Sequence, residues 1–461
     1  MIYERQMAAM IPRKPVPFPC DALPADPAAA RLAGLYPQRQ AGRWMQRVKV
    51  LGGELSPAQW RALAGVARDL APGEPLHLTT RQDVEIHGLG AEGVPAAQRR
   101  LAEAGLIGAG ACGDAVRNLT VCPCSGSLAG RIDLRPHARR IAGLFQDAKG
   151  VVTLPRKFKI SLSCSDACGQ PWINDLGLVF ERRDGRDGFR VIGAGSLGPR
   201  PATGIVLFDW LPACDAPAAA LAAVRIFETR GERQNRSRAR LRHLRERLGD
   251  EEFLALLASS LEEARRENAL PYAALSGAEG ELTAAATLTF PDGDVRPEDA
   301  DALASLAERD ELRVRIGNHH QVVVFGRQES DLRQAVKDPS PLARRAEAQA
   351  TVVACPGTRW CSRAVTDTAG LAARIRSGLA GRAPRLAVCI SGCPNGCAHS
   401  AVADIGLVGM RAGGRGGEED AYDVLAGGGM GRDGRLAGVA ARRLPAGQAV
   451  GEVLRRAAEC P

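Results

Sequence analysis

Hydrophobic and polar positions along the chain follow a plan of strand, helix and strand that occurs twice. Residues 45–50 alternate as a strand does, and residues 56–70, which begin with Ser-Pro, have the pattern of a helix. Residues 76–87 return as strand, loop and strand, and residues 286–325 repeat the same order. We therefore expect two related units with sheets and helices.

The segments around these units have weaker patterns. Residues 1–35 contain several prolines and little periodicity, which predicts an irregular arm. Residues 340–350 are expected to form a linker. No run approaches the ~20 apolar residues of a membrane span, so we expect no membrane association through such a span.

A longer repeat relates the two halves of the chain. Residues 155–179 match residues 384–408 at a constant offset, with the same Pro-Arg pair, the same Cys-x3-Cys spacing and the runs DLGLV and DIGLV. Three shorter motifs also repeat. A Cys-Pro pair at 122–123 recurs at 355–356, a Leu-Pro-Ala run at 211–213 recurs at 444–446, and a strand motif at 81–88 recurs at 319–326. We expect an α+β fold of duplicated halves with pseudo-twofold symmetry, each half containing a ferredoxin-like unit.

Composition narrows the class of protein but does not name a function. The 461 residues are 45% hydrophobic and 25% charged, which excludes a disordered or fibrous chain and suits two or three domains. The formal net charge of +9 suits a small anion, a polycarboxylate cofactor or an acidic protein as partner. The N-terminus lacks a secretory signal, so we expect a cytoplasmic protein, in which 13 cysteines indicate metal binding or catalysis.

Four cysteines in the second half have the spacing of an iron–sulfur site. Cys355 and Cys361 form a Cys-x5-Cys pair, and Cys393 and Cys397 form a Cys-x3-Cys pair. Four thiolates are what a 4Fe-4S cluster needs, one for each iron. Structural zinc favours two to four residues within each pair, so the Cys-x5-Cys spacing disfavours it.

The repeat provides an internal comparison. The first half keeps Cys122, Cys164 and Cys168, but Leu128 stands where Cys361 would be, so we expect no cluster there. The other cysteines are expected to be structural: Cys20, Cys112, Cys124, Cys214, Cys389 and Cys460.

Together these motifs resemble the sirohaem- and 4Fe-4S-containing sulfite and nitrite reductases, most closely the assimilatory sulfite reductase haemoprotein. The resemblance rests on the run SGCPNGC at 391–397 with the Cys-x5-Cys pair, and extends over nearly the whole chain after residue 35. Four further motifs recur in that family in the same order: TTRQ at 79–82, VRN at 116–118, LPRKFK at 154–159 and NDLG at 174–177.

The resemblance implies two cofactors and a division of the chain. It implies a sirohaem joined to the cluster through Cys397, and sirohaem contacts from His77, Thr79, Arg81, His87, Arg236, Arg240 and Asn395. The implied domains are an arm (1–35), a ferredoxin-like unit (36–110), a sirohaem-binding domain without a cluster (111–270), a second ferredoxin-like unit (271–345) and a cluster-bearing domain (346–461).

The resemblance also implies an anion site and a reaction. By similarity the anion is bound by Arg47, Arg117, Lys157 and Lys159, and sulfite is reduced to sulfide by six electrons. Lys157 and Lys159 would lie on one side of an extended strand over residues 154–162, where two ammonium groups repel each other unless an anion lies between them. Family nitrite reductases tend to have Asn in place of Lys159, so sulfite is favoured over nitrite.

Two other functions compete with this one. A precorrin-3B synthase-like enzyme shares the duplicated fold, but the motifs at Arg81-Gln82 and at 157–159 favour the reductases. A cluster-bearing nucleic-acid-binding protein is suggested by eight arginines in residues 230–247, a run with a helical pattern that places Arg236 and Arg240 on one face. That run has no aromatic residue for base stacking, so we expect no nucleic acid partner.

The electron donor is expected to be another protein. The chain has no flavin or nicotinamide motif and no additional ferredoxin-type cysteine motif. A ferredoxin or a flavoprotein subunit must therefore supply the electrons, and we expect a monomer or a complex with the donor.

Overall fold

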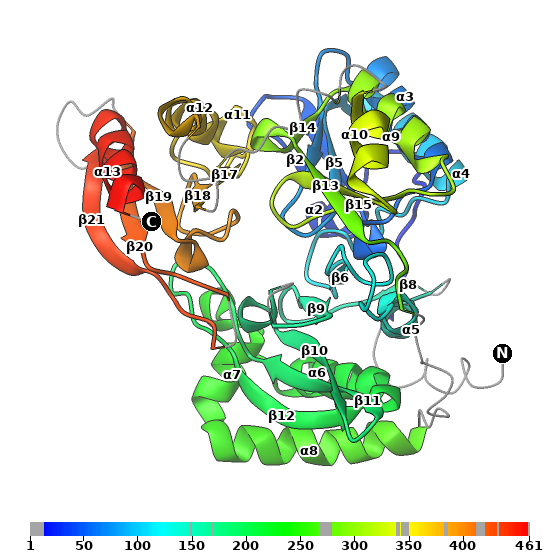
Figure 1. The fold of residues 1–461 in the computed structure, drawn as a ribbon. Coiled ribbons are helices and arrows are strands. Elements are labelled where there is room, and N and C mark those ends of the chain that lie inside the picture. Colours follow the sequence, from blue (N-terminus) through cyan, green and yellow to red (C-terminus); the bar gives the residue numbers. More distant parts are fainter. Residues whose placement is uncertain are drawn as a thin grey trace.

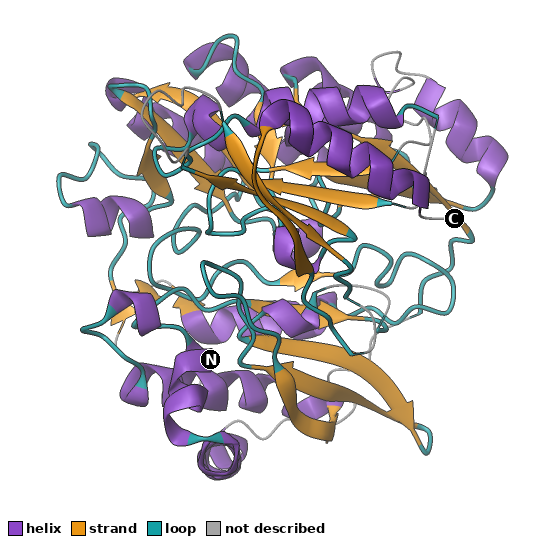
Figure 2. Cartoon of the chain, turned by 90° about the vertical axis from the view of Figure 1, so that its left-hand side faces the viewer, coloured by secondary structure: helices purple, strands orange, loops and turns teal. Residues whose placement is uncertain are grey.

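The computed structural model describes residues 13–147, 150–166, 170–267, 279–337, 342, 350–381, 386–411, 420–430 and 433–459. Cys168, Cys460 and most of the expected linker at 340–350 lie outside these residues. Three groups of strands and helices are arranged around a central region (Figure 1). Figure 2 shows loops gathered between the upper and lower groups.

The two ferredoxin-like units share one core. The first unit's sheet has the order β14-β4-β5-β3-β2, so it includes a strand from the second unit, and the second unit adds a sheet of order β13-β16-β15. The strands are β2 (Leu35–Pro37), β3 (Arg43–Val48), β4 (Leu76–Leu78), β5 (Val84–Gly90), β13 (Ala284–Thr289), β14 (Asp294–Val295), β15 (Arg313–Ile316) and β16 (Gln321–Gly326). The helices are α3 (Pro57–Leu70), α4 (Val94–Glu103), α9 (Pro297–Ala307) and α10 (Glu329–Lys337). Helices α3 and α9 pack on each other, so both units bury their apolar faces together.

Local chemistry explains where the first of these helices begins. The Ser56 hydroxyl accepts a hydrogen bond from Gln59 N at 3.2 Å, and the Gln59 side chain accepts one from Ser56 N at 2.9 Å. This capping box satisfies two N–H groups that the helix itself cannot pair. The predicted helix over residues 56–70 is therefore confirmed.

The two remaining domains repeat one sheet topology. Their sheets have the orders β12-β11-β10-β9-β6 and β21-β20-β19-β18-β17. In both sheets the three strands nearest the β6 or β17 edge are parallel, and the later strands are antiparallel. The first sheet contains β6 (Thr120–Val121), β9 (Ile160–Ser163), β10 (Leu176–Arg183), β11 (Arg186–Gly193) and β12 (Ile205–Pro212). The second contains β17 (Thr351–Ala354), β18 (Ala387–Ser391), β19 (Ile405–Met410), β20 (Ala421–Ala426) and β21 (Gly438–Pro445).

Helices cover these sheets, and each domain has its own core. The first domain has α5 (Arg135–Phe145), α6 (Ala216–Arg230), α7 (Leu241–Leu248) and α8 (Asp250–Glu267), and the second has α11 (Gly357–Trp360), α12 (Thr368–Leu379) and α13 (Ala446–Glu459). None of the described helices has the length and apolar character needed to cross a bilayer. The predicted α+β fold of duplicated halves is confirmed.

Symmetry-related residues meet at the centre. Gln170 and His399, which are 229 positions apart like the repeat itself, share a hydrogen bond of 2.9 Å between Nε2 and Nδ1. Gln82 and His320 occupy equivalent positions in the two units, and both have positive φ angles, 62° and 58°. The Gln82 side chain donates to the carbonyls of Val121 and Ile316 at 2.8 Å each, which ties the first domain to the second ferredoxin-like unit.

Two sequence expectations differ from the structure near the N-terminus and before β9. The described part of the arm contains β1 (Arg13–Lys14) and the helix α2 (Pro27–Leu32), whose first N–H groups are capped by Asp26. Strand β1 extends a small sheet with β8 (Gly150–Val152) and β7 (Gln146–Asp147). Strand β9 begins at Ile160, so both lysines of the LPRKFK run lie in the segment that leads into it.

Candidate active site

Parallel pairing of β17 and β18 brings cysteines from the second half together. Cys355 follows β17 and Cys393 follows β18, so both lie at the carboxyl edge of the sheet. The short helix α11 places Cys361 after the first of them, and a turn leads to Cys397. The Gly392 N–H donates a hydrogen bond to Cys355 Sγ at 3.2 Å.

The charges of these thiols influence one another. Burial, and then the negative charge of Cys397, raise the pKa of Cys355 to about 12. Burial also raises the pKa of Cys361 and Cys393, and Cys397 raises both further. Thiolates gathered in this way need a cation between them, because metal ligation is what stabilises their deprotonated form. The donor set therefore fits a 4Fe-4S cluster.

The cluster loop faces the first ferredoxin-like unit. The Thr80 hydroxyl donates to the carbonyl oxygen of Cys397 at 3.0 Å, while the side chains of Cys397 and Asn395 are exposed. An exposed sulfur at this position suits the predicted bridge to a second metal centre. The roles of Cys397 and Asn395 stay predictions.

The turn between β4 and β5 holds Arg81 in place. The Thr79 hydroxyl accepts hydrogen bonds from the N–H groups of Arg81 and Asp83, at 3.2 and 3.0 Å. The Arg81 guanidinium donates to Asn174 Oδ1 at 2.9 Å and to the carbonyls of Asn118 and Ile160 at 2.6 and 3.2 Å. Burial lowers the pKa of Arg81 to about 10. Arg81 therefore links three of the family-like motifs into one buried network.

The two predicted histidines lie against a tryptophan of the cluster segment. His87 shares a hydrogen bond of 3.0 Å with Glu85 and stacks on Trp360, with ring centroids 3.8 Å apart. His77 lies edge-on to Trp360 and to His320, with centroids 5.9 and 5.2 Å apart. Sequence reasoning missed Trp360 and His320. In the sequence, the only indication for His320 is that it occupies the position equivalent to Gln82 in the repeat.

Two half-buried lysines have no carboxylate partner among the described residues. Lys157 and Lys159 form no hydrogen bond or ion pair through their ammonium groups with the described residues. Burial, followed by the positive charges of Arg240 and Arg117, lowers the pKa of Lys157 to about 7. Burial, followed by Arg81 and Lys157, lowers the pKa of Lys159 well below its ordinary value. These influences show that the lysines and arginines converge on one electropositive region.

The two predicted arginines of the anion site have protein partners. The Arg47 guanidinium forms an ion pair with Glu85 and donates to the Ala111 carbonyl at 3.4 Å. Arg117 donates to the same Ala111 carbonyl at 3.1 Å and to the Gly113 carbonyl at 2.7 Å. Both arginines are thus held in place from one side by the chain. Anion binding by them stays a prediction.

The helical pattern predicted across residues 230–247 is wrong. Helix α6 ends at Arg230, a single 3-10 turn covers Arg236–Arg238, and α7 begins after Arg240, so Arg236 and Arg240 do not share a helix face. The chain breaks there because Gly231 caps α6 and the Asn235 side chain caps the 3-10 turn. Arg236 pairs with Asp114 at 2.7 Å in an exposed position.

Acidic neighbours also account for much of this arginine run. The buried Arg240 donates to both carboxylate oxygens of Asp175, at 2.7 and 3.2 Å, and Asp175 also accepts from Lys159 N at 2.8 Å. Further ion pairs join Arg233, Arg242 and Arg245 to Glu228, Glu246 and Asp250, respectively. The run is therefore largely paired within the protein.

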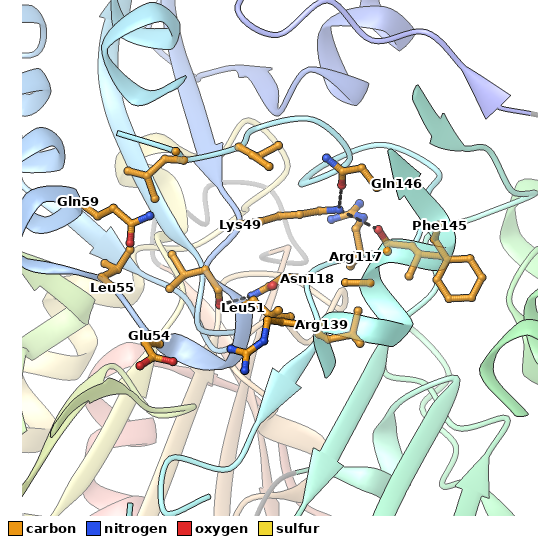
Figure 3. Close-up of a pocket in the computed structure, with 18 residues that line it drawn as sticks. Lys49, Leu51, Glu54, Leu55, Gln59, Arg117, Asn118, Arg139, Phe145 and Gln146 are labelled. Atoms are coloured by element: carbon orange, nitrogen blue, oxygen red, sulfur yellow. Dashed lines mark hydrogen bonds between the residues drawn. The ribbon is translucent and has the colours of Figure 1, made fainter. Parts of the chain in front are cut away.

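A separate cavity of about 620 Å³ lies beside this region. Figure 3 shows Lys49, Arg117 and Asn118 in its wall, with the Lys49 ammonium bound to Gln146 at 2.7 Å. The wall includes neither of the two uncompensated lysines nor the cluster cysteines. We therefore place the candidate active site where the lysines, Arg81 and the Cys397 loop converge.

Comparison with known proteins agrees with this arrangement. The family model "Nitrite and sulphite reductase 4Fe-4S domain" matches residues 112–265 and 346–456, and the corresponding ferredoxin-like half domain matches residues 36–104. An assimilatory ferredoxin-dependent nitrite reductase of Haloferax mediterranei is 30% identical across 91% of this chain and 80% of its own length. "Sulfite reductase [ferredoxin] 2" of Mycolicibacterium paratuberculosis is 28% identical across 87% and 79%.

The fold itself also matches a solved structure. The NirA protein of Mycobacterium tuberculosis superimposes with a TM-score of 0.80 at 23% identity, covering 98% of this chain and 89% of that one. The family models and the Haloferax relative decide the assignment, because both extend over most of the chain. The chain belongs to the nitrite and sulphite reductase family, oxidoreductases whose cofactors are a sirohaem and a 4Fe-4S cluster.

Proposed function

We propose that this chain reduces sulfite to sulfide, taking six electrons from a partner protein. The observation that carries the proposal is the pair Lys157 and Lys159, two half-buried lysines whose ammonium groups have no carboxylate partner among the described residues. A dianion interacts with two such cations more strongly than a monoanion does, because the Coulomb energy scales with the product of the charges.

The protein side chains around the site suit the cofactors. Cys355, Cys361, Cys393 and Cys397 would hold the cluster, whereas the sirohaem carboxylates would be bound by the cations and histidines of the first unit. His87 Nδ1 and Arg81 Nε are buried and lack hydrogen-bond partners in the described structure, so polar capacity remains at this site, whereas His77 Nδ1 lies 3.8 Å from Asp294 Oδ1. When bound, the cluster would deliver electrons to the site, and the sirohaem would supply the iron to which the substrate oxyanion binds.

The chain itself orients the anion and supplies protons. Lys157 and Lys159 compensate the substrate charge, and cations that the fold holds in position stabilise an anion without having to reorganise. With its pKa near 7, the Lys157 ammonium can release a proton at neutral pH and be recharged. The Asp175 carboxylate positions Lys159 by accepting its backbone N–H at 2.8 Å.

Nitrite reduction to ammonia is the alternative. It is favoured by the Haloferax relative, which is named as a nitrite reductase. The deciding experiment measures kcat/KM for sulfite and for nitrite with a reduced low-potential dye, in the wild type and in Lys159→Asn, and detects sulfide as product. Removing one cation at ~8 Å with an effective dielectric constant of ~20 costs a dianion about 2 kcal/mol more than a monoanion. We therefore expect the sulfite-to-nitrite ratio of kcat/KM to fall roughly 30-fold.

A matched control for this variant is Lys14→Asn, since Lys14 is exposed on β1. It should leave both activities unchanged. A strong wild-type preference for nitrite that Lys159→Asn does not alter would refute the sulfite assignment.

We propose ferredoxin as the electron donor. Support comes from the Haloferax and Mycolicibacterium relatives, both named as ferredoxin enzymes, and from the net charge of +9, which attracts an acidic partner. Turnover driven by reduced ferredoxin should fall steeply with added salt, while turnover driven by a neutral dye should not. Turnover with a flavoprotein but not with ferredoxin would contradict this choice.

A further inference from the structure

Three cysteine sulfurs meet in the first half of the chain, away from the four expected cluster ligands. The Sγ atoms of Cys122, Cys124 and Cys164 all lie within 4.8 Å of one another. Cys122 and Cys164 are buried, with exposed fractions of 1% and 7%, and Cys124 is half-buried. In the part of the chain that the structure describes, no other three histidine, cysteine or acidic side chains come this close.

Strand pairing explains why these side chains meet. Strands β6 and β9 run parallel, Cys122 follows β6 and Cys164 follows β9, so both cysteines leave the same edge of the sheet. The chain then turns back at once: Ser125 N donates to the Cys122 carbonyl at 3.0 Å, and Leu128 N donates to the Cys124 carbonyl at 3.0 Å. This tight turn places Cys124 beside the other two cysteines, although the sequence grouped it with the structural ones.

The same scaffold holds the cluster cysteines in the second half. There, Cys355 follows β17 and Cys393 follows β18, which are the repeat counterparts of β6 and β9. The Cys164 N–H donates to Cys122 Sγ at 3.0 Å, as the Gly392 N–H donates to Cys355 Sγ at 3.2 Å. A backbone N–H aimed at a sulfur stabilises negative charge on it. The first half therefore contains the framework of a thiolate metal site.

The spacing of the sulfurs indicates which metal fits. Sulfurs bound tetrahedrally to a single zinc ion at Zn–S distances of about 2.3 Å lie roughly 3.8 Å apart. In a 4Fe-4S cluster each thiolate binds a different iron, which keeps the sulfurs farther apart. The closeness of the three sulfurs, all within 4.8 Å of one another, therefore favours a single ion.

We propose that Cys122, Cys124 and Cys164 bind one zinc ion, which joins the end of β6 to the end of β9 in the first domain. Binding converts the three thiols to thiolates and releases their protons to solvent, with no change of oxidation state. The Cys164 thiol, which donates to the Ile132 carbonyl at 3.4 Å, gives up this hydrogen bond when its proton leaves to solvent and the sulfur binds zinc. A fourth ligand completes the tetrahedron. Cys168 lies outside the described residues and is not part of the proposed site.

The test is a metal analysis of the full-length protein, purified without chelators from cells supplied with zinc, iron and sirohaem. We expect about one zinc per chain in addition to iron, and sulfur neighbours at about 2.3 Å in the zinc X-ray absorption spectrum of the wild type. Cys124→Ser should lower zinc at least fivefold without lowering iron, while Cys361→Ser should lower iron and keep zinc. Cys214→Ser, at a half-buried cysteine of neither group, should change neither metal.

Several results would overturn the proposal. These are wild-type protein without zinc, zinc without sulfur neighbours, Cys124→Ser protein that keeps its zinc, and a disulfide within the three cysteines detected by mass spectrometry after alkylation. The absorption measurement uses the wild type alone, so it decides the matter even where a variant does not fold. The zinc site is independent of the substrate, because a failure of sulfite reduction would leave the zinc content unaffected.

Discussion

Replacing Arg240 by Met tests whether a buried ion pair with Asp175 holds the segment around Lys159 in place. Arg240 is 10% exposed at its side chain and Asp175 is 0% exposed, and the guanidinium contacts both carboxylate oxygens at 2.7 and 3.2 Å. The substitution leaves the Asp175 charge buried, with the Lys159 N–H as its remaining partner among these contacts. Removing one partner of a buried pair costs about 3–5 kcal/mol.

Arg236→Met is the matched comparison for this variant. Arg236 also pairs with an aspartate at 2.7 Å, but its side chain is 58% exposed. Water screens such a pair, so its loss should cost less than about 1 kcal/mol. Both variants are measured by urea-induced unfolding followed by circular dichroism, with the same cofactor loading.

The double variant Arg240→Met, Asp175→Asn isolates the pair itself. Because it removes both buried charges, it should recover part of the lost stability, with a coupling energy of about 0.5–3 kcal/mol. Equal midpoints for Arg240→Met and Arg236→Met would refute the reasoning, since the two pairs differ chiefly in burial and in the second arginine, Arg156, that lies 3.6 Å from Asp114. The same result would also contradict the proposal that Asp175 positions Lys159.

Three further predictions follow from single residues. Ser56→Ala removes the capping hydroxyl of α3 and should lower the free energy of unfolding by about 1 kcal/mol in urea titrations, whereas an unchanged midpoint would contradict the capping role. His137 is buried, which lowers its pKa to about 4, below its unfolded value of ~6.5. The unfolded state therefore binds more protons in that window, so stability should fall by up to about 3 kcal/mol from pH ~6.5 to ~4, and His137→Phe should flatten this profile. Lys157 loses its charge as the pH rises above about 7, so KM for nitrite should rise about tenfold per pH unit there, and Lys157→Met should abolish the slope if the ammonium binds the anion.

Prediction from the sequence succeeded where the determining contacts are local or duplicated. The capping box at Ser56 and Gln59 lies within one turn of chain, so the beginning of α3 follows from four residues. The repeat predicted the duplicated halves because similar sequences in the two copies pack into sheets with the same strand order. The spacing of four cysteines predicted a 4Fe-4S cofactor, which the family match supports, because ligand spacing is itself a sequence property.

Contacts between distant segments could not be predicted in this way. The pattern across residues 230–247 has helical periodicity, yet Gly231 and Asn235 cap separate elements, and five of its arginines form ion pairs with acidic residues. Trp360 stacks on His87 only because the second half folds back onto β5. Arg47 has Glu85 as its partner because β3 and β5 are neighbours in the sheet.

The sequence by itself determined the duplicated α+β architecture, the family and the 4Fe-4S cofactor, because these follow from periodicity, repetition and motif spacing. Only the tertiary structure decided which cations have no carboxylate partner among the described residues, as at Lys157 and Lys159, and which sulfurs meet, as at Cys124. Burial and pairing are properties of the assembled sheets. The burial and the pairing of a side chain depend on contacts with residues that lie tens or hundreds of positions away in the chain. The sequence pattern alone does not show which of these residues come into contact.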